Sequence, residues 1–263
     1  MYPILLQIGP ATIYSLWVFL ALGIFVSLLI VNKLAKSRLI KLAFLAENSL
    51  LIFLCGLIAA RLTFIAYNFA YYWNIVVDQG HIIEIFYIWD KGLSSWGGLA
   101  GIFLSLYLLS KNSKEDYKAW SDILVVSVAF AMFFINIGAF LDGRNYGNPT
   151  ELPWGILVES SQYAIPIHPV QIYAAIYCGL IGLILLQLFN KKAFKTPGII
   201  SLSGIFLYSF FRFIEEFMRG DETIYILDVL REAQIYVLIT LLLSGYLLYK
   251  YFKKYLKEHH SLW

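Results

Sequence analysis

Arginine and glutamate side chains interrupt an apolar run near residue 210. In RFIEEFMR, residues 212 to 219, Arg212 and Glu216 are four positions apart, so a helix would place them on one face, with Arg219 three residues further on. Guanidinium groups bind phosphate or carboxylate through two parallel hydrogen bonds, especially where water is partly excluded. The pattern therefore indicates either a site for an anion or a structural ladder of ion pairs.

A second arginine of this kind is Arg61, in the apolar run GLIAARLTFIAYN. An ionisable group within a membrane helix is costly and is by default a functional candidate. The side chain of Arg61 could instead reach the membrane surface or form an internal ion pair. Because Arg61 and Arg212 share this character, we favour a site for an anionic ligand.

The stretch IHPVQIY, residues 167 to 173, pairs His168 with Pro169, which suits the first turn of a helix. We place His168 at the cap position, where free N–H groups and the helix dipole would attract an anion. Imidazole also titrates near neutral pH, which suits a general base. Capping alone would explain His168 equally well.

A charged, glycine-rich stretch, FLDGRNYGNPTELPWGI, spans residues 140 to 156. Gly143 and Gly147, together with two prolines, allow the backbone to bend. Irregular backbone at membrane level is tolerated only where it lines a cavity or is covered by protein. We therefore predict that this stretch, which carries Asp142 and Arg144, forms the rim of a cavity.

These residues belong to a chain of 263 residues that is 60% hydrophobic and 14% charged, outside the range of soluble globular domains. A bilayer core of about 30 Å needs roughly 20 apolar residues per helix. Such windows do not alternate in polarity as barrel strands do, so the predicted fold class is all-α, a single membrane domain over residues 1–263. The seven windows are 11–32, 48–70, 92–110, 121–141, 170–190, 197–217 and 231–250.

The basic residues divide by type between the two sides of the membrane. Fourteen of the 20, all but one of them lysines, follow the first, third, fifth and seventh windows. The positive-inside rule makes that side cytoplasmic, so the N-terminus lies outside and the C-terminus inside. Loops 71–91 and 142–169 then form a small extracytoplasmic head. Five of the six other basic residues are arginines, which again indicates an anionic ligand on the outer side.

Helix geometry gives approximate depths for the candidate residues. A rise of about 1.5 Å per residue puts Arg61 about 21 Å and Arg212 about 25 Å from the inner face. Asp142 comes out near 30 Å, and Trp96 to Gly98 near 20 Å, by the same arithmetic. We therefore expect these elements to converge in the outer leaflet.

Small residues in the apolar windows have simpler explanations. In GLSSWGGLAG, Gly97, Gly98 and Gly101 either let helices pack closely or contact lipid. Cys55 and Cys178 both fall inside apolar windows, where a cysteine usually acts as a small buried hydrophobe.

Several stretches, in order and spacing, resemble the prolipoprotein diacylglyceryl transferase family over nearly the whole chain. They are IGPATIYSLWVFLALG, GLIAARLTFIAYN, WDKGLSSWGGLAG, GAFLDGRNYGNPTELPWG, HPVQIY and RFIEEFMR. The resemblance implies a seven-helix enzyme of the bacterial inner membrane whose active site faces the outer leaflet. It also implies transfer of diacylglyceryl from phosphatidylglycerol, a membrane lipid, to the lipobox cysteine thiol of a preprolipoprotein, with release of glycerol phosphate. No metal, other cofactor or nucleic acid is implied.

The resemblance carries over to individual positions. It implies that His168, Glu216 and Arg212 are catalytic and that Arg61 and Arg212 bind the lipid phosphate. The general base stays open among His168, Glu216, Asp142 and Tyr146. Other positions are expected to shape the site: Trp96, Gly97, Gly98, Gly138, Gly143, Tyr146, Gly147 and Gln171.

This chain departs from the family signature, which usually reads GRIGNFxNGExxG, where it has NIGAFLDGRNYG. Asn136 stands where a phosphate-binding arginine is expected, Ala139 where asparagine is expected, and Arg144 where glutamate is expected. Trp96 replaces a histidine, and Leu16 replaces a tyrosine. Our hypothesis is that Arg144 supplies the missing charge from the other side of the turn, with Asn136 at the same phosphate site.

Two other classes of function compete with the transferase. A non-catalytic family member would bind an anionic lipid or a lipoprotein precursor without turnover. A small-solute membrane transporter would show an inverted repeat or polar residues at mid-depth on several helices, whereas the polar residues here are confined to the outer half.

Overall fold

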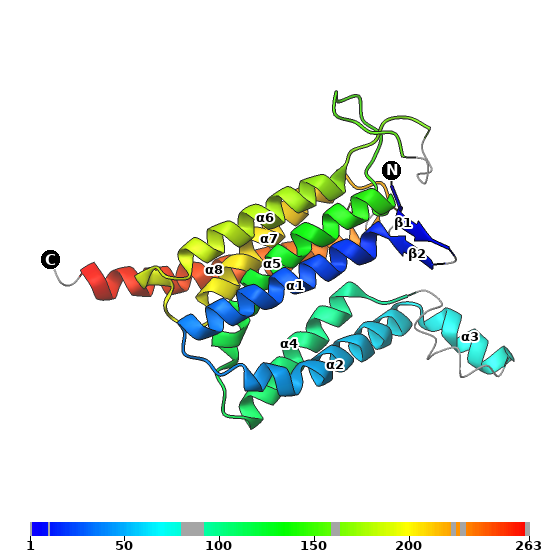
Figure 1. The fold of residues 1–263 in the computed structure, drawn as a ribbon. Helices are drawn as coiled ribbons and strands as arrows, with labels where there is room; N and C mark the ends of the chain where they lie inside the picture. The colour runs from blue at the N-terminus through cyan, green and yellow to red at the C-terminus, as the bar shows by residue number, and fades with distance from the viewer. Residues whose placement is uncertain are drawn as a thin grey trace. The chain divides into compact units, whose positions relative to one another are not determined.

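The computed structural model describes residues 2–9, 11–79, 92–158, 164–221, 225–226 and 230–260. The chain forms two compact units: unit 1 comprises Met1–Arg38 and Lys118–Trp263, and unit 2 comprises Leu39–Tyr117 (Figure 1). Residues 80–91 of the predicted outer loop lie outside the described residues. The assignment to a single membrane domain stays a prediction.

Unit 1 is a bundle of helices that run side by side, with the C-terminal end of α8 extending beyond the others (Figure 1). A short 3-10 helix, η2 (Lys192–Phe194), lies between two of them. The helices are α1 (Ser15–Ser37), α5 (Tyr117–Asp142), α6 (Val170–Leu188), α7 (Ile199–Glu215) and α8 (Glu232–His260). Two small hairpins complete the unit, β1 (Ile4–Ile8) with β2 (Ala11–Tyr14) and β3 (Tyr225–Ile226) with β4 (Leu230–Arg231).

Small residues bring the helices of unit 1 into close contact. Gly23 of α1 faces the backbone of α5, and a Cβ at Gly23 would lie 2.9 Å from the carbonyl oxygen of Ala131. Gly182 of α6 lies against the ring of Phe130, also on α5. Because lipid tails are as apolar as the side chains, such close packing is a main source of attraction between membrane helices.

The first predicted window begins with a strand where a helix was expected. Residues 11–14 pair with β1 in an antiparallel hairpin, and Gly9 has the positive φ of a tight turn. Ile4, Ile8 and Ile13 are β-branched, which favours extended backbone. The helix begins at Ser15, whose hydroxyl donates to the carbonyl of Tyr2 at 2.5 Å, so the hairpin is fastened to the start of α1.

A carboxylate from α5 caps the start of α7. The N-cap residue of α7 is Gly198, which has no side chain that could accept a capping hydrogen bond. The carboxylate of Asp122 accepts instead, from the backbone N–H groups of Gly198 at 2.9 Å and Ser201 at 2.7 Å. Asp122 is 2% exposed. A carboxylate at a helix N-terminus satisfies free N–H groups and matches the helix dipole. Asp122 therefore fixes the start of α7 on α5.

Replacing Asp122 with alanine should lower the free energy of unfolding by about 1–3 kcal/mol, because the N–H groups of Gly198 and Ser201 would lose their acceptors. Thermal denaturation of the detergent-solubilised protein measures this loss. Asp122→Asn keeps one carbonyl acceptor and should cost less. Equal stability of Asp122→Ala and the wild type would show that the cap contributes nothing.

Unit 2 consists of α2 (Ala43–Tyr67), α3 (Phe69–Gln79) and α4 (Ser95–Asn112). Helix α2 packs along α4. Gly97 of α4 meets Thr63 and Ala59 of α2, and a Cβ at Gly101 would lie 2.8 Å from the carbonyl oxygen of Cys55. These contacts support the packing role of the small residues. Helix α3 occupies part of the predicted loop 71–91, which is a difference from the sequence prediction.

The membrane character predicted from composition is confirmed by the helices. Within the described residues, α1, α2, α5, α6 and residues 232–258 of α8 are five helices long and apolar enough to cross a membrane. Helices of 18 and 17 residues, α4 and α7, occupy the two remaining windows. The protein is therefore an all-α, multi-pass membrane protein, and the count of seven spans stays a prediction.

Candidate active site

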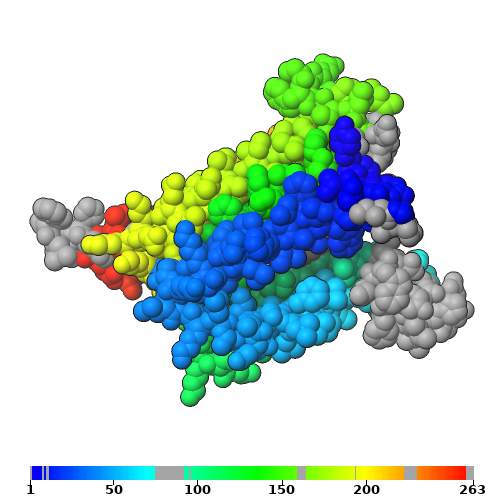
Figure 2. Space-filling model, viewed as in Figure 1, coloured from blue at the N-terminus to red at the C-terminus, as the bar shows by residue number. Residues whose placement is uncertain are grey.

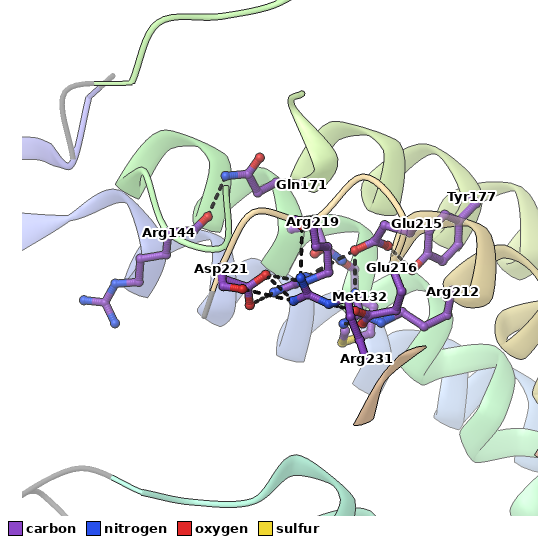
Figure 3. Close-up of polar contacts among 11 residues, drawn as sticks. Met132, Arg144, Gln171, Tyr177, Arg212, Glu215, Glu216, Arg219, Asp221 and Arg231 are labelled. Atoms are coloured by element: carbon purple, nitrogen blue, oxygen red, sulfur yellow. Dashed lines mark hydrogen bonds and ion pairs between the residues drawn. The ribbon is translucent and has the colours of Figure 1, made fainter. Parts of the chain in front are cut away.

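A buried network of ion pairs lies at the C-terminal end of α7 in unit 1 (Figure 3). Glu215 contacts Arg212 and Arg219, and Glu216 contacts Arg212 and Arg231. Asp221 contacts Arg219 at 2.7 Å and Arg231 at 3.0 Å. Three arginines thus face three carboxylates, and the set has no net charge when all are ionised.

The expected pairing of Arg212 with Glu216 four residues later is present. The ladder that was weighed as an alternative to an anion site is also present, because Arg219 pairs with Glu215 at 3.2 Å. The ladder is therefore present, and the site for an anion stays a prediction, for which the exposure of each arginine is the relevant observation.

The three arginines differ in how far their guanidinium groups are occupied. The side chain of Arg212 is 20% exposed, against 11% for Arg219 and 7% for Arg231. Within the described residues, the guanidinium of Arg212 contacts Glu215 through Nη1 and Glu216 through Nη2, so its Nε hydrogen is not engaged in either pair. Arg231 uses Nε, Nη1 and Nη2 at once. Arg212 is thus the arginine best able to bind a further anion.

Arg231 had no role in the sequence interpretation. It is in β4, and it donates to Glu216 at 2.8 Å and to the backbone carbonyls of Arg219 at 3.0 Å and Asp221 at 3.2 Å. Burial alone would raise the pKa of Asp221, but the hydrogen bond from Arg219 and the charges of both arginines lower it below its ordinary value. The surplus of arginines among the outer basic residues was the only signal in the sequence for the part that Arg231 takes in this network.

The glycine-rich loop after α5 is fastened to two other elements. The N–H of Gly147 donates to the carbonyl of His168 at 3.2 Å, and that of Asn148 donates to Met218 at 2.8 Å. A Cβ at Gly147 would lie 2.5 Å from the carbonyl oxygen of His168 and 2.7 Å from that of Met218, so only glycine fits. This loop, the start of α6 and the end of α7 therefore meet within unit 1, while the predicted convergence with Arg61 and Trp96 stays a prediction.

Figure 2 shows the segment that includes this loop, in green, projecting from unit 1 at the same end as the N-terminal hairpin, in blue. Gly143 begins the loop with a positive φ of 76°. The carbonyl of Tyr146 accepts a hydrogen bond from the N–H of Gly220 at 3.1 Å, which is a further tie to the turn after α7.

Arg144 contributes its backbone and its side chain in different directions. Its carbonyl accepts a hydrogen bond from Nε2 of Gln171 at 2.5 Å, which ties the loop to the first turn of α6. Its side chain is 69% exposed, forms an ion pair with Asp142, and points away from the network (Figure 3). Gln171 is thus a link between elements, and Arg144 presents its charge at the surface.

His168 lies one residue before the cap of α6. Pro169 has non-helical backbone angles and is the N-cap, so the helix begins only at Val170. The prediction that His168 occupies the cap position was therefore wrong by one residue. Nδ1 of His168 lies 3.3 Å from the hydroxyl of Tyr173, which accepts a hydrogen bond from Nε1 of Trp154 at 2.7 Å. Burial lowers the pKa of His168 below 6.5, so the neutral imidazole dominates at neutral pH.

The first part of the signature, which includes Asn136 and Gly138, lies within α5. Nδ2 of Asn136 donates to the carbonyl of Met132 at 2.8 Å, so this side chain bonds to its own helix. Gly138 is buried against α1, where a Cβ would lie 2.8 Å from that of Phe19. Gly138 therefore allows α1 and α5 to pack closely. At position 136, where the family signature has an arginine, Asn136 forms a hydrogen bond within its own helix.

The remaining predicted site residues belong to unit 2. Arg61 is 6% exposed, and its Nη1 donates to the carbonyl of Gly92 at 3.1 Å. Its guanidinium also lies over the rings of Tyr72 at 5.4 Å and Phe64 at 5.8 Å. Trp96 lies in the first turn of α4, which Ser94 caps by accepting from Gly97. Within unit 2, Arg61 thus has polar and aromatic partners suited to a buried cation.

Comparison of the sequence with known proteins identifies the family to which the chain belongs. The family model for prolipoprotein diacylglyceryl transferase matches residues 3–250. A phosphatidylglycerol–prolipoprotein diacylglyceryl transferase of Clostridium tetani is 33% identical over 227 residues, which cover 84% of this chain and 86% of that protein. Proteins of the same name are 30% identical in Tolumonas auensis, over 85% of this chain and 84% of that protein, and 29% identical in Clostridioides difficile, over 93% and 92%. The chain therefore belongs to the prolipoprotein diacylglyceryl transferase family.

Proposed function

We propose that this protein transfers the diacylglyceryl group of phosphatidylglycerol to the thiol of the lipobox cysteine in preprolipoproteins. The observation that carries the proposal is the family match over residues 3–250, together with Arg212, the most exposed of the three arginines in the network. The names of the relatives supply both substrates, and the lipobox segment is our extension.

In the proposed reaction the cysteine thiolate attacks the glyceryl carbon that bears the phosphate. A carbon–sulfur bond forms, and the bond between the glyceryl carbon and the phosphate oxygen breaks. Glycerol phosphate leaves with the electron pair of that bond. The thiol has an ordinary pKa of about 8.5, so a base must remove its proton. The departing phosphate gains charge, which a guanidinium can stabilise in a site with little water.

We assign the phosphate to Arg212 and the proton to His168. Among the described residues, neither ion pair of Arg212 uses its Nε edge, and the lowered pKa of His168 keeps its imidazole neutral and able to accept a proton. The loop that carries Gly147 is bonded to His168 and to the turn after α7, which supports a shared site. Glu216 is 1% exposed and therefore serves better as a partner of Arg212 than as the base.

Arg61 and Arg144 remain proposed phosphate ligands, and the role of Arg144 can be tested directly. Arg144→Ala removes a largely exposed charge and should weaken phosphatidylglycerol binding if this residue replaces the arginine absent at Asn136. Unchanged binding and transfer would leave that role to Arg212 and Arg61.

The proposed location is the bacterial inner membrane, with seven spans, the N-terminus outside and the C-terminus in the cytoplasm. The lysines after the first, third, fifth and seventh windows support this orientation. The network at the end of α7 would then face the outer leaflet, where both substrates arrive.

The assay supplies the purified protein, in vesicles containing phosphatidylglycerol, with a lipobox peptide. We expect mass spectrometry to detect a thioether-linked diacylglyceryl peptide and an equal amount of free glycerol phosphate. Vesicles of phosphatidylcholine alone are the control for the lipid, and a peptide with serine in place of cysteine is the control for the thiol. A folded protein that binds phosphatidylglycerol yet gives neither product would support the non-catalytic alternative.

The pH dependence of transfer follows from the state of His168. Because burial lowers its pKa below 6.5, the imidazole stays neutral at neutral pH and gains a proton only on further acidification. We expect kcat/KM to fall on the acid side at a pH below about 6.5. In His168→Gln the rate should drop by about 10²–10⁴-fold and this acid limb should vanish. An acid limb that persists in the variant would assign the base to another residue.

A further inference from the structure

Tyr177 of α6 is a buried hydroxyl aimed at the network. Its Oη donates to Oε2 of Glu215 at 2.7 Å. Its ring stacks on Phe211 of α7, with centroids 5.6 Å apart and planes 8° from parallel. In the sequence Tyr177 is one aromatic among many in an apolar window, so nothing marked it for a role. The stacked ring fixes where the hydroxyl points.

Both oxygens of Glu215 are engaged through this contact. Oε1 accepts from Nη1 of Arg212 at 2.5 Å and from Nη1 of Arg219 at 3.2 Å, while Oε2 accepts from Tyr177. Without the hydroxyl, Oε2 would be a buried anionic oxygen with no donor, which is costly. Arg212 already donates to Oε1 of the same carboxylate, so we expect the carboxylate to turn toward the remaining N–H groups of Arg212.

The other side of Arg212 is held differently. Oε2 of Glu216 accepts from Arg231 at 2.8 Å, which leaves Oε1 for the ion pair with Arg212. Each carboxylate that grips Arg212 therefore has its second oxygen occupied by a residue from another element. Tyr177 donates to the second oxygen of Glu215, as Arg231 donates to the second oxygen of Glu216.

We propose that Tyr177 is a positioning residue that, by holding Oε2 of Glu215, keeps the Nε edge of Arg212 open for the phosphate of the lipid. This inference rests on the proposed function, in which Arg212 binds that phosphate. It assigns Tyr177 an effect on the affinity for the lipid and none on the affinity for the peptide.

The test compares Tyr177→Phe with Tyr236→Phe. Both remove one hydroxyl that donates to a carboxylate, because Tyr236 donates to Glu232 at 3.1 Å. We expect Tyr177→Phe to raise the Kd for dihexanoyl phosphatidylglycerol, and the KM for phosphatidylglycerol in the transfer assay, by about 3- to 10-fold. The KM for the lipobox peptide should be unchanged. Tyr236→Phe should change none of the three.

The outcomes separate this inference from the proposed function. If Tyr177→Phe binds the lipid as the wild type does, the positioning role is wrong, even where the yield of folded protein falls. If the wild type transfers nothing but Tyr177→Phe still weakens lipid binding, the positioning role stands and the proposed transfer fails. Phe211→Leu loosens the ring and keeps the hydroxyl, so it should raise the Kd by a smaller factor. That variant decides the matter if Tyr177→Phe does not fold.

Discussion

Replacing Arg212 with lysine should lower the rate of diacylglyceryl transfer by about 10²–10³-fold, although the positive charge is kept. The guanidinium contacts Glu215 and Glu216 through separate nitrogens and has its Nε edge left for a phosphate. An ammonium group is a point charge that cannot hold two carboxylates and present a third donor in a fixed direction. The measurement is the initial rate of thioether formation in vesicles, per amount of folded protein.

The matched control for this variant is Lys254→Arg. Lys254 forms an exposed ion pair with Glu258 at 3.7 Å, and exchanging the two cations there should leave the rate unchanged. Retention of more than about one tenth of the wild-type rate by Arg212→Lys would mean that geometry at this position is unimportant. The phosphate would then have to be bound by other arginines.

The largest expected effect on stability belongs to Arg231→Met, which should lower the free energy of unfolding by about 3–5 kcal/mol. Methionine fills a similar volume but removes the charge that Glu216 and Asp221 share. It also leaves the carbonyls of Arg219 and Asp221 without these donors. Unfolding in mixed micelles, followed by tryptophan fluorescence, measures the change.

A second substitution distinguishes a lost ion pair from lost packing. Glu216→Gln removes one of the carboxylates that Arg231→Met leaves buried without its partner, so the double variant should be more stable than Arg231→Met alone. If the two destabilisations simply add, the charge interaction is not the cause. The exposed pair at Lys254 again serves as a control, since Lys254→Met should leave the unfolding midpoint unchanged.

The sequence was sufficient for contacts that lie within one helix. Arg212 and Glu216 could be paired because a helix brings positions four apart together, and five of the apolar windows contain helices suited to crossing a membrane. The lysine and arginine imbalance also pointed to anionic partners on the arginine side. Within the described residues of unit 1, four of those arginines have carboxylate partners of the chain itself.

Contacts between distant elements could not be predicted in this way. Tyr177 and Arg231 reach the network from α6 and β4, and neither has a spacing to Glu215 or Glu216 that a local rule could use. The cap that Asp122 gives to α7 is of the same kind, since its partners follow 76 and 79 residues later. The strand at residues 11–14 was missed because hydropathy does not distinguish an apolar strand from the start of an apolar helix.

Helix α7 is anchored at both ends, by Asp122 at its start and by the arginine network at its finish. A helix held in this way cannot slide along its axis, so Arg212 stays roughly 20 Å from Ile199. The position of Arg212 along the helix axis is therefore set by the protein, whereas the position of the lipid headgroups is set by the thickness of the bilayer. Hydrophobic thickness therefore decides how far a lipid must sink or rise to meet the arginine, and membranes of different chain length would offer the same substrate at different depths.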